Sequence, residues 1–302
     1  MSVLGRPGVA AVAARAMRTL ADLTGRAVAR RRAALFPEFP GHTTEITIPS
    51  AVAPAAATVY RPASAGPRPP VHVNFHGGGF VMRGTWLDDP LCRYLAAEAG
   101  VVVVNVDYVV APGHPFPAPV RQAYEVVTWL ARHDEGWNGA RLTVGGQSAG
   151  GALAAAVARQ ALEQGGPPIA LQVLHYPPLD LTVPAAAKKP AIAKPLLRPW
   201  MGEVFDSAYV PNVATRADRL VSPAGPADTA DLTGIAPALV ITAEHDRLCA
   251  EGVRYAHRLD DAGALVAHHD VRGADHGYDV GDPRKARETY ALIARHVRDA
   301  TA

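Results

Sequence analysis

A serine in a glycine-rich turn is the first residue of this sequence whose setting could support covalent chemistry. Ser148 lies in Gly146-Gln147-Ser148-Ala149-Gly150, between the β-type run 142–144 and the helix-forming run 152–159. On a strand-to-helix turn of this spacing, a serine is strained, its hydroxyl is exposed above the sheet, and the next backbone N–H faces the same point. Because the spacing also occurs by chance, a nucleophilic Ser148 requires a base, an acid and an anion site elsewhere.

A histidine is the expected base, because its pKa lies near neutrality and serine reacts only when its proton is removed. The chain has 12 histidines, so position must decide between them. His276 follows the last predicted strand, 265–271, in a turn-like stretch. Sites of open parallel sheets lie beyond the carboxyl ends of the strands, which favours His276. His268 and His269 alternate to opposite faces of that strand, so a metal site there is disfavoured and no metal is expected.

A carboxylate should hold the imidazole of the base in the useful tautomer. Asp246 comes just after the predicted strand 238–243 and is the favoured residue. Glu244 and Glu251 are its rivals. Glu244 is still close to the strand, and Glu251 is expected to point from a helix.

The anion site is predicted from the stretch His76-Gly77-Gly78-Gly79-Phe80, which follows the strand 71–75. Consecutive glycines let backbone N–H groups point into a pocket without side-chain obstruction. Gly77, Gly78 and Gly79, together with the N–H of Ala149, are therefore the predicted oxyanion hole. The loss of one such donor typically costs about 3–4 kcal/mol of barrier. The plainer alternative is a tight loop with no role in binding.

Strand and helix patterns alternate along most of the chain, which predicts an α/β fold. The nearly continuous β-branched run 101–108 suits a central parallel strand that is buried on both faces. We expect a mostly parallel central sheet of about eight strands, with helices on both faces and a helical cap. Strands are predicted over 44–48, 58–61, 71–75, 101–108, 142–144, 170–176, 238–243 and 265–271, and helices over 87–99, 120–133, 152–159, 250–262 and 283–299.

Two stretches do not follow the alternation. Residues 1–35 are rich in Ala and Arg and predict one or two amphipathic helices, broken near Gly25, that form part of a lid. Residues 182–225 are punctuated by prolines and are too long for a simple loop. The expected organisation is an N-terminal helical cap segment, 1–45, and a catalytic domain, 46–302, with a cap insertion at 182–225.

An apolar substrate pocket is expected between the cap and the site. Ordinary core packing is the alternative for each candidate. The candidate side chains are Phe80, Trp86, Trp200, Met201 and Phe205.

Bulk composition narrows the function classes. The 302 residues carry a net charge of +2, so nucleic acid is not an expected partner. The two cysteines exclude a disulfide framework and favour a reducing, cytoplasmic location. No apolar run is long enough to cross a membrane, and no secretory signal is evident. The basic N-terminal helix leaves a weak membrane-surface contact open, and an oligomeric assembly is equally open.

Taken together, these motifs resemble those of the hormone-sensitive-lipase-like esterases, or bacterial family IV, of the α/β-hydrolase fold. The order Ser148, Asp246, His276 is the nucleophile–acid–base order of that fold. The resemblance implies these three catalytic roles, an oxyanion hole of the glycine loop with Ala149, and a cap. It extends over about residues 70–280 and is carried by His76-Gly77-Gly78-Gly79-Phe80, Val106-Asp107-Tyr108, Ala111-Pro112, His114-Pro115-Phe116-Pro117-Ala118, Gly146-Gln147-Ser148-Ala149-Gly150-Gly151, Asp246 with Leu248, and His276-Gly277-Tyr278.

Three positions depart from the family pattern. Gln147 stands where an acid usually precedes the serine, Gly113 replaces a glutamate, and Arg247 replaces a proline. None removes a catalytic group, although the local field becomes less negative. We therefore expect a cofactor-free hydrolase of small-molecule esters with short- to medium-chain acyl groups. Amide, carbamate or thioester hydrolysis by the same triad is the near alternative, and a non-catalytic small-molecule-binding protein is the remote one.

Overall fold

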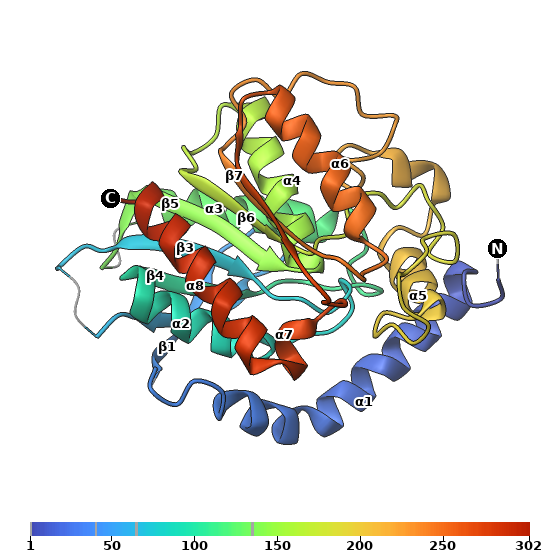
Figure 1. Ribbon diagram of the computed structural model, residues 1–302, viewed down its shortest axis with the longest axis horizontal. Coiled ribbons are helices and arrows are strands. Elements are labelled where there is room, and N and C mark those ends of the chain that lie inside the picture. Colours follow the sequence, from blue (N-terminus) through green and yellow to red (C-terminus); the bar gives the residue numbers. More distant parts are fainter. Residues whose placement is uncertain (1, 40, 64–65, 134–135) are drawn as a thin grey trace.

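The computed structural model describes residues 2–39, 41–63, 66–133 and 136–302, apart from the side chain of Arg26. Within these residues one eight-stranded sheet crosses the molecule in the order β1-β2-β4-β3-β5-β6-β7-β8 (Figure 1). β2 pairs antiparallel with β1 and β4, and the other neighbours are parallel. The strands are β1 (His42–Ile48), β2 (Ala55–Arg61), β3 (Pro70–Phe75), β4 (Val102–Asp107), β5 (Asn138–Gln147), β6 (Leu171–His175), β7 (Ala238–Ala243) and β8 (Leu265–Val271).

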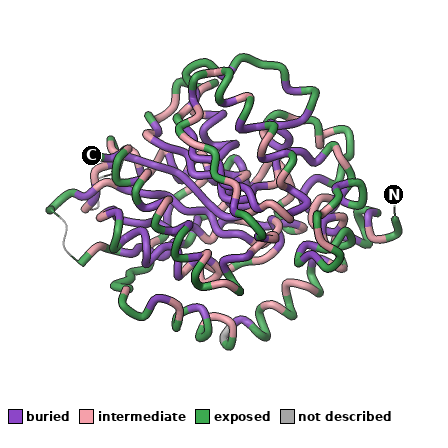
Figure 2. The backbone as a smooth tube through the Cα atoms, viewed as in Figure 1, coloured by how far each residue is buried: buried purple, intermediate pink, exposed green. Residues whose placement is uncertain are grey.

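Helices cover both faces of the sheet, which is why its central strands are buried throughout (Figure 2). Alternate side chains of β4 belong to different cores: Val102 and Val104 to one, Val103 to the other. The first core includes side chains of α3 (Ala118–Arg132), α4 (Ala149–Gln164) and α6 (Cys249–Asp261). The second includes side chains of α2 (Asp89–Ala99) and α8 (Pro283–Ala300).

The N-terminal segment forms α1 (Pro7–Ala33), a single long helix along one edge of the molecule (Figure 1). The expected break near Gly25 is wrong. A Cβ at Gly25 would lie 3.5 Å from the indole ring of Trp86, an ordinary van der Waals distance, so this part of the helix packs beside that ring. A single glycine costs a helix only about 1 kcal/mol, which is too little to break a helix of 27 residues.

The irregular stretch 182–225 contains α5 (Pro199–Tyr209) and the short 3-10 helix η2 (Val213–Ala217). α5 packs against α1, so the two stretches that broke the βα alternation lie together. The predicted helix over 87–99 divides into η1 (Thr85–Leu87) and α2.

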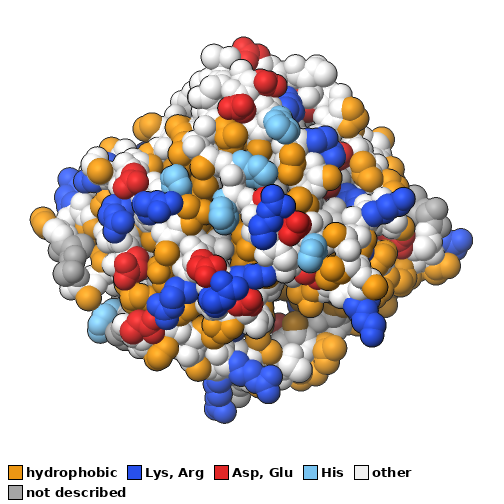
Figure 3. All heavy atoms as spheres, viewed as in Figure 1, with side chains coloured by type: hydrophobic (Ala, Val, Ile, Leu, Met, Phe, Trp, Pro, Cys, Tyr) orange, Lys and Arg blue, Asp and Glu red, His pale blue; other side chains and the backbone are white. Residues whose placement is uncertain are grey.

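The surface and helix lengths add two further observations. Basic and acidic side chains are interspersed over the face in Figure 3, in keeping with the small net charge. No helix within the described residues is both long enough and apolar enough to cross a bilayer.

Candidate active site

The turn between β5 and α4 holds Ser148 in a backbone conformation that side chains rarely adopt. Its φ is 52° and its ψ is −119°, which costs about 1–3 kcal/mol and persists only where the surroundings enforce it. The flanking glycines are required sterically. A Cβ at Gly146 would lie 2.3 Å from the Phe75 carbonyl oxygen, and a Cβ at Gly150 only 1.7 Å from it.

Gly150→Ala should therefore destabilise the fold by about 3 kcal/mol or more, because the clashing atom is backbone of β3 and cannot rotate away. Chemical denaturation measures the change. Gly8→Ala is the matched control. A Cβ at Gly8 in α1 meets nothing within 4 Å, so this variant should be neutral or slightly stabilising. Equal stability of the two variants would contradict the steric role of Gly150.

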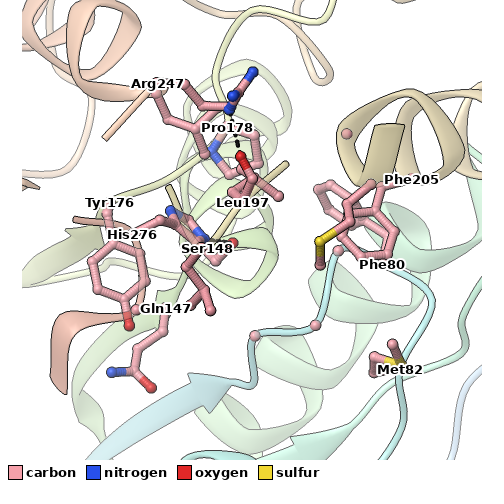
Figure 4. A pocket seen from close by; sticks show the side chains of 18 of the residues that line it. Phe80, Met82, Gln147, Ser148, Tyr176, Pro178, Leu197, Phe205, Arg247 and His276 are labelled. Carbon is pink, nitrogen blue, oxygen red and sulfur yellow. Dashed lines mark hydrogen bonds between the residues drawn. The ribbon is translucent and has the colours of Figure 1, made fainter. Parts of the chain in front are cut away.

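Three side chains form a chain of hydrogen bonds at the carboxyl ends of the strands. Ser148 Oγ lies 2.9 Å from His276 Nε2, and His276 Nδ1 lies 2.7 Å from Asp246 Oδ2. Ser148 comes from the turn after β5, Asp246 from the turn after β7, and His276 from the segment after β8. The same trio predicted from chain order is thus brought within bonding distance, and Figure 4 shows Ser148 beside His276.

The environment of His276 suits a base that becomes charged. Burial lowers its pKa, but the charge of Asp246 and the hydrogen bond that His276 donates to that carboxylate more than offset this, so the pKa is raised above its usual value. Asp246 is itself 4% exposed and accepts a second hydrogen bond, from the Leu248 N–H at 3.0 Å.

The two rival carboxylates have other partners. Glu244 accepts hydrogen bonds from the Gly273 N–H at 2.7 Å and from Arg272 at 3.1 Å. Glu251 pairs with Lys188 at 2.7 Å and accepts the Leu179 N–H at 2.8 Å. Neither makes a hydrogen bond to His276.

The glycine loop after β3 lies next to Ser148. Gly78 and Gly79 have φ values of 116° and 62°, a region that favours glycine, and no acceptor within the described residues takes their N–H groups. Ala149 is the first residue of α4, where the backbone N–H has no intrahelical partner. Gly77 differs, since its N–H points at Asp88 Oδ1 at 3.4 Å. This contact narrows the predicted anion site to Gly78, Gly79 and Ala149.

Ser148 and His276 open into a cavity of about 270 Å³ beneath the segment that contains α5. Of the five predicted pocket residues, Phe80, Met201 and Phe205 line this cavity. Trp86 lies outside the lining and packs on Gly25 and Gly84. Trp200 also lies outside it and is 46% exposed. Both were predicted from their apolar character, which does not determine the direction in which a side chain points.

Arg247, one of the departures from the family pattern, joins the turn of the acid to the insertion. Its guanidinium donates to the Leu197 carbonyl at 2.6 Å and to the Ala185 carbonyl at 2.8 Å, and the former bond is visible in Figure 4. A proline could make neither bond. This role had no local signal, because both acceptors are about 50 or more residues away along the chain.

Comparison with known proteins identifies the family of the chain. A family model described as the alpha/beta hydrolase fold matches residues 72–280. The chain belongs to the α/β-hydrolase family. The predicted fold class and the resemblance to the hormone-sensitive-lipase-like esterases are thereby confirmed.

Several α/β-hydrolases of known name or structure are similar to the chain. Esterase LipI of Mycobacterium tuberculosis is 33% identical over 82% of this chain and 80% of its own length. Carboxylesterase NlhH of the same species is 35% identical over 69% of this chain and 66% of its own length. The hyperthermophilic esterase of the archaeon Pyrobaculum calidifontis is 34% identical with a TM-score of 0.86, covering 96% of this chain and 92% of that one.

Within the described residues, no group of three or more His, Cys, Asp or Glu side chains is arranged to hold a metal ion. Cys92 and Cys249 are both free thiols.

Proposed function

We propose that this α/β-hydrolase cleaves carboxylic esters with short- to medium-chain acyl groups, with Ser148 as nucleophile, His276 as base and Asp246 as its partner. The ester hydrolase class follows from family membership together with the esterases to which the chain is similar. One observation carries the assignment of roles. Ser148 Oγ lies 2.9 Å from an imidazole that Asp246 holds from the other side, at the wall of an apolar cavity.

The reaction has two halves. In the first, Ser148 Oγ attacks the ester carbonyl carbon while His276 Nε2 takes the hydroxyl proton. The resulting oxyanion accepts hydrogen bonds from the backbone N–H groups of Gly78, Gly79 and Ala149. His276 then gives the proton to the leaving alcohol as the tetrahedral intermediate collapses to an acyl-enzyme. In the second half, water loses a proton to His276 and attacks the acyl carbon, and Ser148 leaves with that proton restored.

The lining of the cavity supports an apolar acyl group of limited length. The Phe205 ring lies so close to Gly79 that a Cβ at that glycine would come within 2.5 Å of the ring. Phe80 stacks on Tyr209 with ring centroids 3.8 Å apart. Ligand sites usually enclose about 300–1,000 Å³, so a cavity of about 270 Å³ favours small esters.

A series of p-nitrophenyl esters of increasing chain length tests this proposal, with Ser148→Ala as the inactive control. We expect kcat/KM to be highest for short acyl chains and to fall as the chain lengthens. If the wild type cleaves no ester, the proposal is wrong, and hydrolysis of amides, carbamates or thioesters, or binding without catalysis, takes its place.

Phe205→Ala should move the preference toward longer acyl chains, because it removes the ring that closes the cavity above Gly79. One added methylene in an apolar pocket is worth about 1–3 kcal/mol. We therefore expect the ratio of kcat/KM for a longer ester to that for the acetate to rise about 10-fold or more. Trp200→Ala, outside the lining and exposed, is the matched control and should leave the ratio unchanged. A ratio that moves equally in both variants would refute the placement of Phe205.

We further propose that residues 1–45 and 182–225 act together as the cap. α1 and α5 pack on each other, and Arg32 of α1 lines the cavity together with Met201 and Phe205 of α5. α1 also leaves Leu20 and Leu23 exposed. Weak membrane-surface contact through this helix, an oligomeric assembly and a cytoplasmic location stay predictions.

A further inference from the structure

A buried carboxylate lies behind the catalytic trio, in the short helix α7 (Tyr278–Gly281). Asp279 is 1% exposed. Its Oδ2 accepts hydrogen bonds from Gln147 Nε2 at 2.5 Å and from the Tyr290 hydroxyl at 2.7 Å. Its Oδ1 accepts the Tyr176 hydroxyl at 2.7 Å. Three neutral donors, from β5, α8 and the residue after β6, thus bond to one carboxylate. The mechanism above gives this carboxylate no part.

Two of these donors adjoin the reacting groups. Gln147 is the last residue of β5 and directly precedes Ser148. The ring of Tyr176 packs against the imidazole of His276, with ring centroids 4.9 Å apart. Figure 4 shows the Tyr176 hydroxyl and the Gln147 amide turned to the same side, away from the cavity wall formed by Phe80 and Phe205.

Tyr176 also has a strained backbone, with φ at 40°. Strain of this kind is retained only where the surroundings over-determine it. The hydrogen bond to Asp279 fixes the far end of the Tyr176 side chain, so it contributes to holding the ring against His276.

Asp279 is ionised at neutral pH. Burial raises its pKa, but the nearby His175, the hydrogen bonds from Tyr290 and Tyr176 and the positive charge of Arg32 in α1 more than offset this and hold the pKa below its usual value. Asp246 and, more weakly, Asp275 and Asp279 raise the pKa of His276 against the effect of burial. The charge of Asp279 therefore favours the protonated imidazole.

We propose that Asp279 is a positioning residue for ester hydrolysis: its charge holds Gln147 and the end of β5 that carries Ser148, holds Tyr176 against His276, and favours the imidazolium that forms during attack. The inference rests on the proposed function, because it takes Ser148 and His276 as the reacting groups. Asp279 acts through these neighbours and touches no reacting atom.

Gln147 and Asp279 are matched in hydrogen-bonding type. The amide of Gln147 offers an N–H to the carboxylate. A carboxylate at 147 would instead face that of Asp279, and two carboxylates this close cannot both ionise. Gln147, which departs from the family pattern, is thus hydrogen-bonded to Asp279. The amide directly precedes Ser148, and the carboxylate lies three residues after His276. Exchanging the amide and the carboxylate between positions 147 and 279 should keep the hydrogen bond between them.

The test combines Asp279→Asn, Gln147→Glu and the double variant Q147E/D279N, measured with a p-nitrophenyl ester as a function of pH. In Asp279→Asn we expect kcat to fall about 10-fold and the acidic limb of kcat/KM to move to lower pH by about half a pH unit, since His276 loses a neighbouring negative charge. In Gln147→Glu we expect a fall in kcat of about 100-fold from like-charge repulsion. The double variant should recover to within about 5-fold of wild type.

Tyr176→Phe keeps the ring and the charge but removes one bond, so kcat should fall about 3-fold with the acidic limb unmoved. This milder variant decides the question if Asp279→Asn does not fold. Asp282→Asn is the matched control, because Asp282 caps α8, asparagine caps equally well, and the substitution removes one charge from the same segment. It should leave both kcat and the limb unchanged.

The outcomes separate this inference from the proposed function. A loss of thermal stability in Asp279→Asn with unchanged kcat and unchanged acidic limb would overturn the positioning role. A double variant less active than Gln147→Glu alone would overturn the matched pair. Either result, with Ser148→Ala inactive, leaves the nucleophile assignment standing, whereas full activity of Ser148→Ala removes the basis of both.

Discussion

Ser148→Ala is expected to lower kcat for p-nitrophenyl esters by at least about 10⁴-fold. The variant removes the atom that bonds to the acyl carbon and the proton that His276 Nε2 accepts at 2.9 Å. The oxyanion donors and the cavity remain, so the substrate still binds and a small residual rate over the uncatalysed reaction persists.

The measurement should include binding and stability as well as rate. A substrate analogue should bind Ser148→Ala as tightly as wild type, because the cavity lining is unchanged, and the free energy of unfolding should change by less than about 1 kcal/mol. Ser50→Ala, at a serine that does not line the cavity, should keep full activity. Full activity of Ser148→Ala would refute the mechanism. Loss of activity together with loss of the fold would instead assign Ser148 a structural role.

Asp246→Asn is expected to lower kcat by about 10⁴-fold. The carboxylate accepts the Nδ1 proton of His276 at 2.7 Å, which leaves Nε2 free to take the proton of Ser148. An amide that offers its N–H to Nδ1 stabilises the other tautomer, with the proton on Nε2, and this form cannot act as a base.

The pH dependence of the same variant gives a second, independent result. In wild type, kcat/KM should fall as the pH drops through the pKa of His276, which Asp246 raises above its usual value against the effect of burial. Without that charge the pKa is lower, so the residual activity of Asp246→Asn should persist to lower pH than that of wild type. An acidic limb at the same or higher pH would contradict the pairing of Asp246 with His276.

The rival carboxylates provide the controls. Glu244→Gln and Glu251→Gln should keep kcat within about 3-fold of wild type, since both carboxylates bond to other groups. Glu251→Gln should lower stability, because it breaks a buried pair with Lys188. If kcat fell 10³-fold or more in one of these variants while Asp246→Asn stayed active, that glutamate and not Asp246 would be the partner of His276.

Much of the fold and the trio could be predicted from the sequence, because their signals are local. The β-branched run 101–108 suits a central strand buried on both faces, and residues 102–107 of it form β4. The glycines at 146 and 150 match a turn in which Ser148 has a positive φ. Asp246 and His276 lie in the turns that follow β7 and β8, where a parallel sheet brings side chains together.

Only the tertiary structure decided the features that depend on residues distant in the chain. Gly25 continues a helix rather than breaking it, because one glycine costs a helix only about 1 kcal/mol and α1 packs against α5. Trp86 and Trp200 carry the apolar character of pocket residues but point elsewhere. Gly77 leaves the predicted anion site because its N–H faces Asp88.

Gln147 shows most clearly the difference between what local sequence predicts and what only the tertiary structure decides. By sequence it is an isolated departure beside the nucleophile, and its partner Asp279 lies 132 residues away. Turn geometry and strand periodicity are properties of neighbouring residues, so the sequence by itself determined the fold class and which three residues are proposed as the catalytic trio. Which buried donor meets which carboxylate depends on how β5, β6, α7 and α8 pack, and local sequence carries no signal for that.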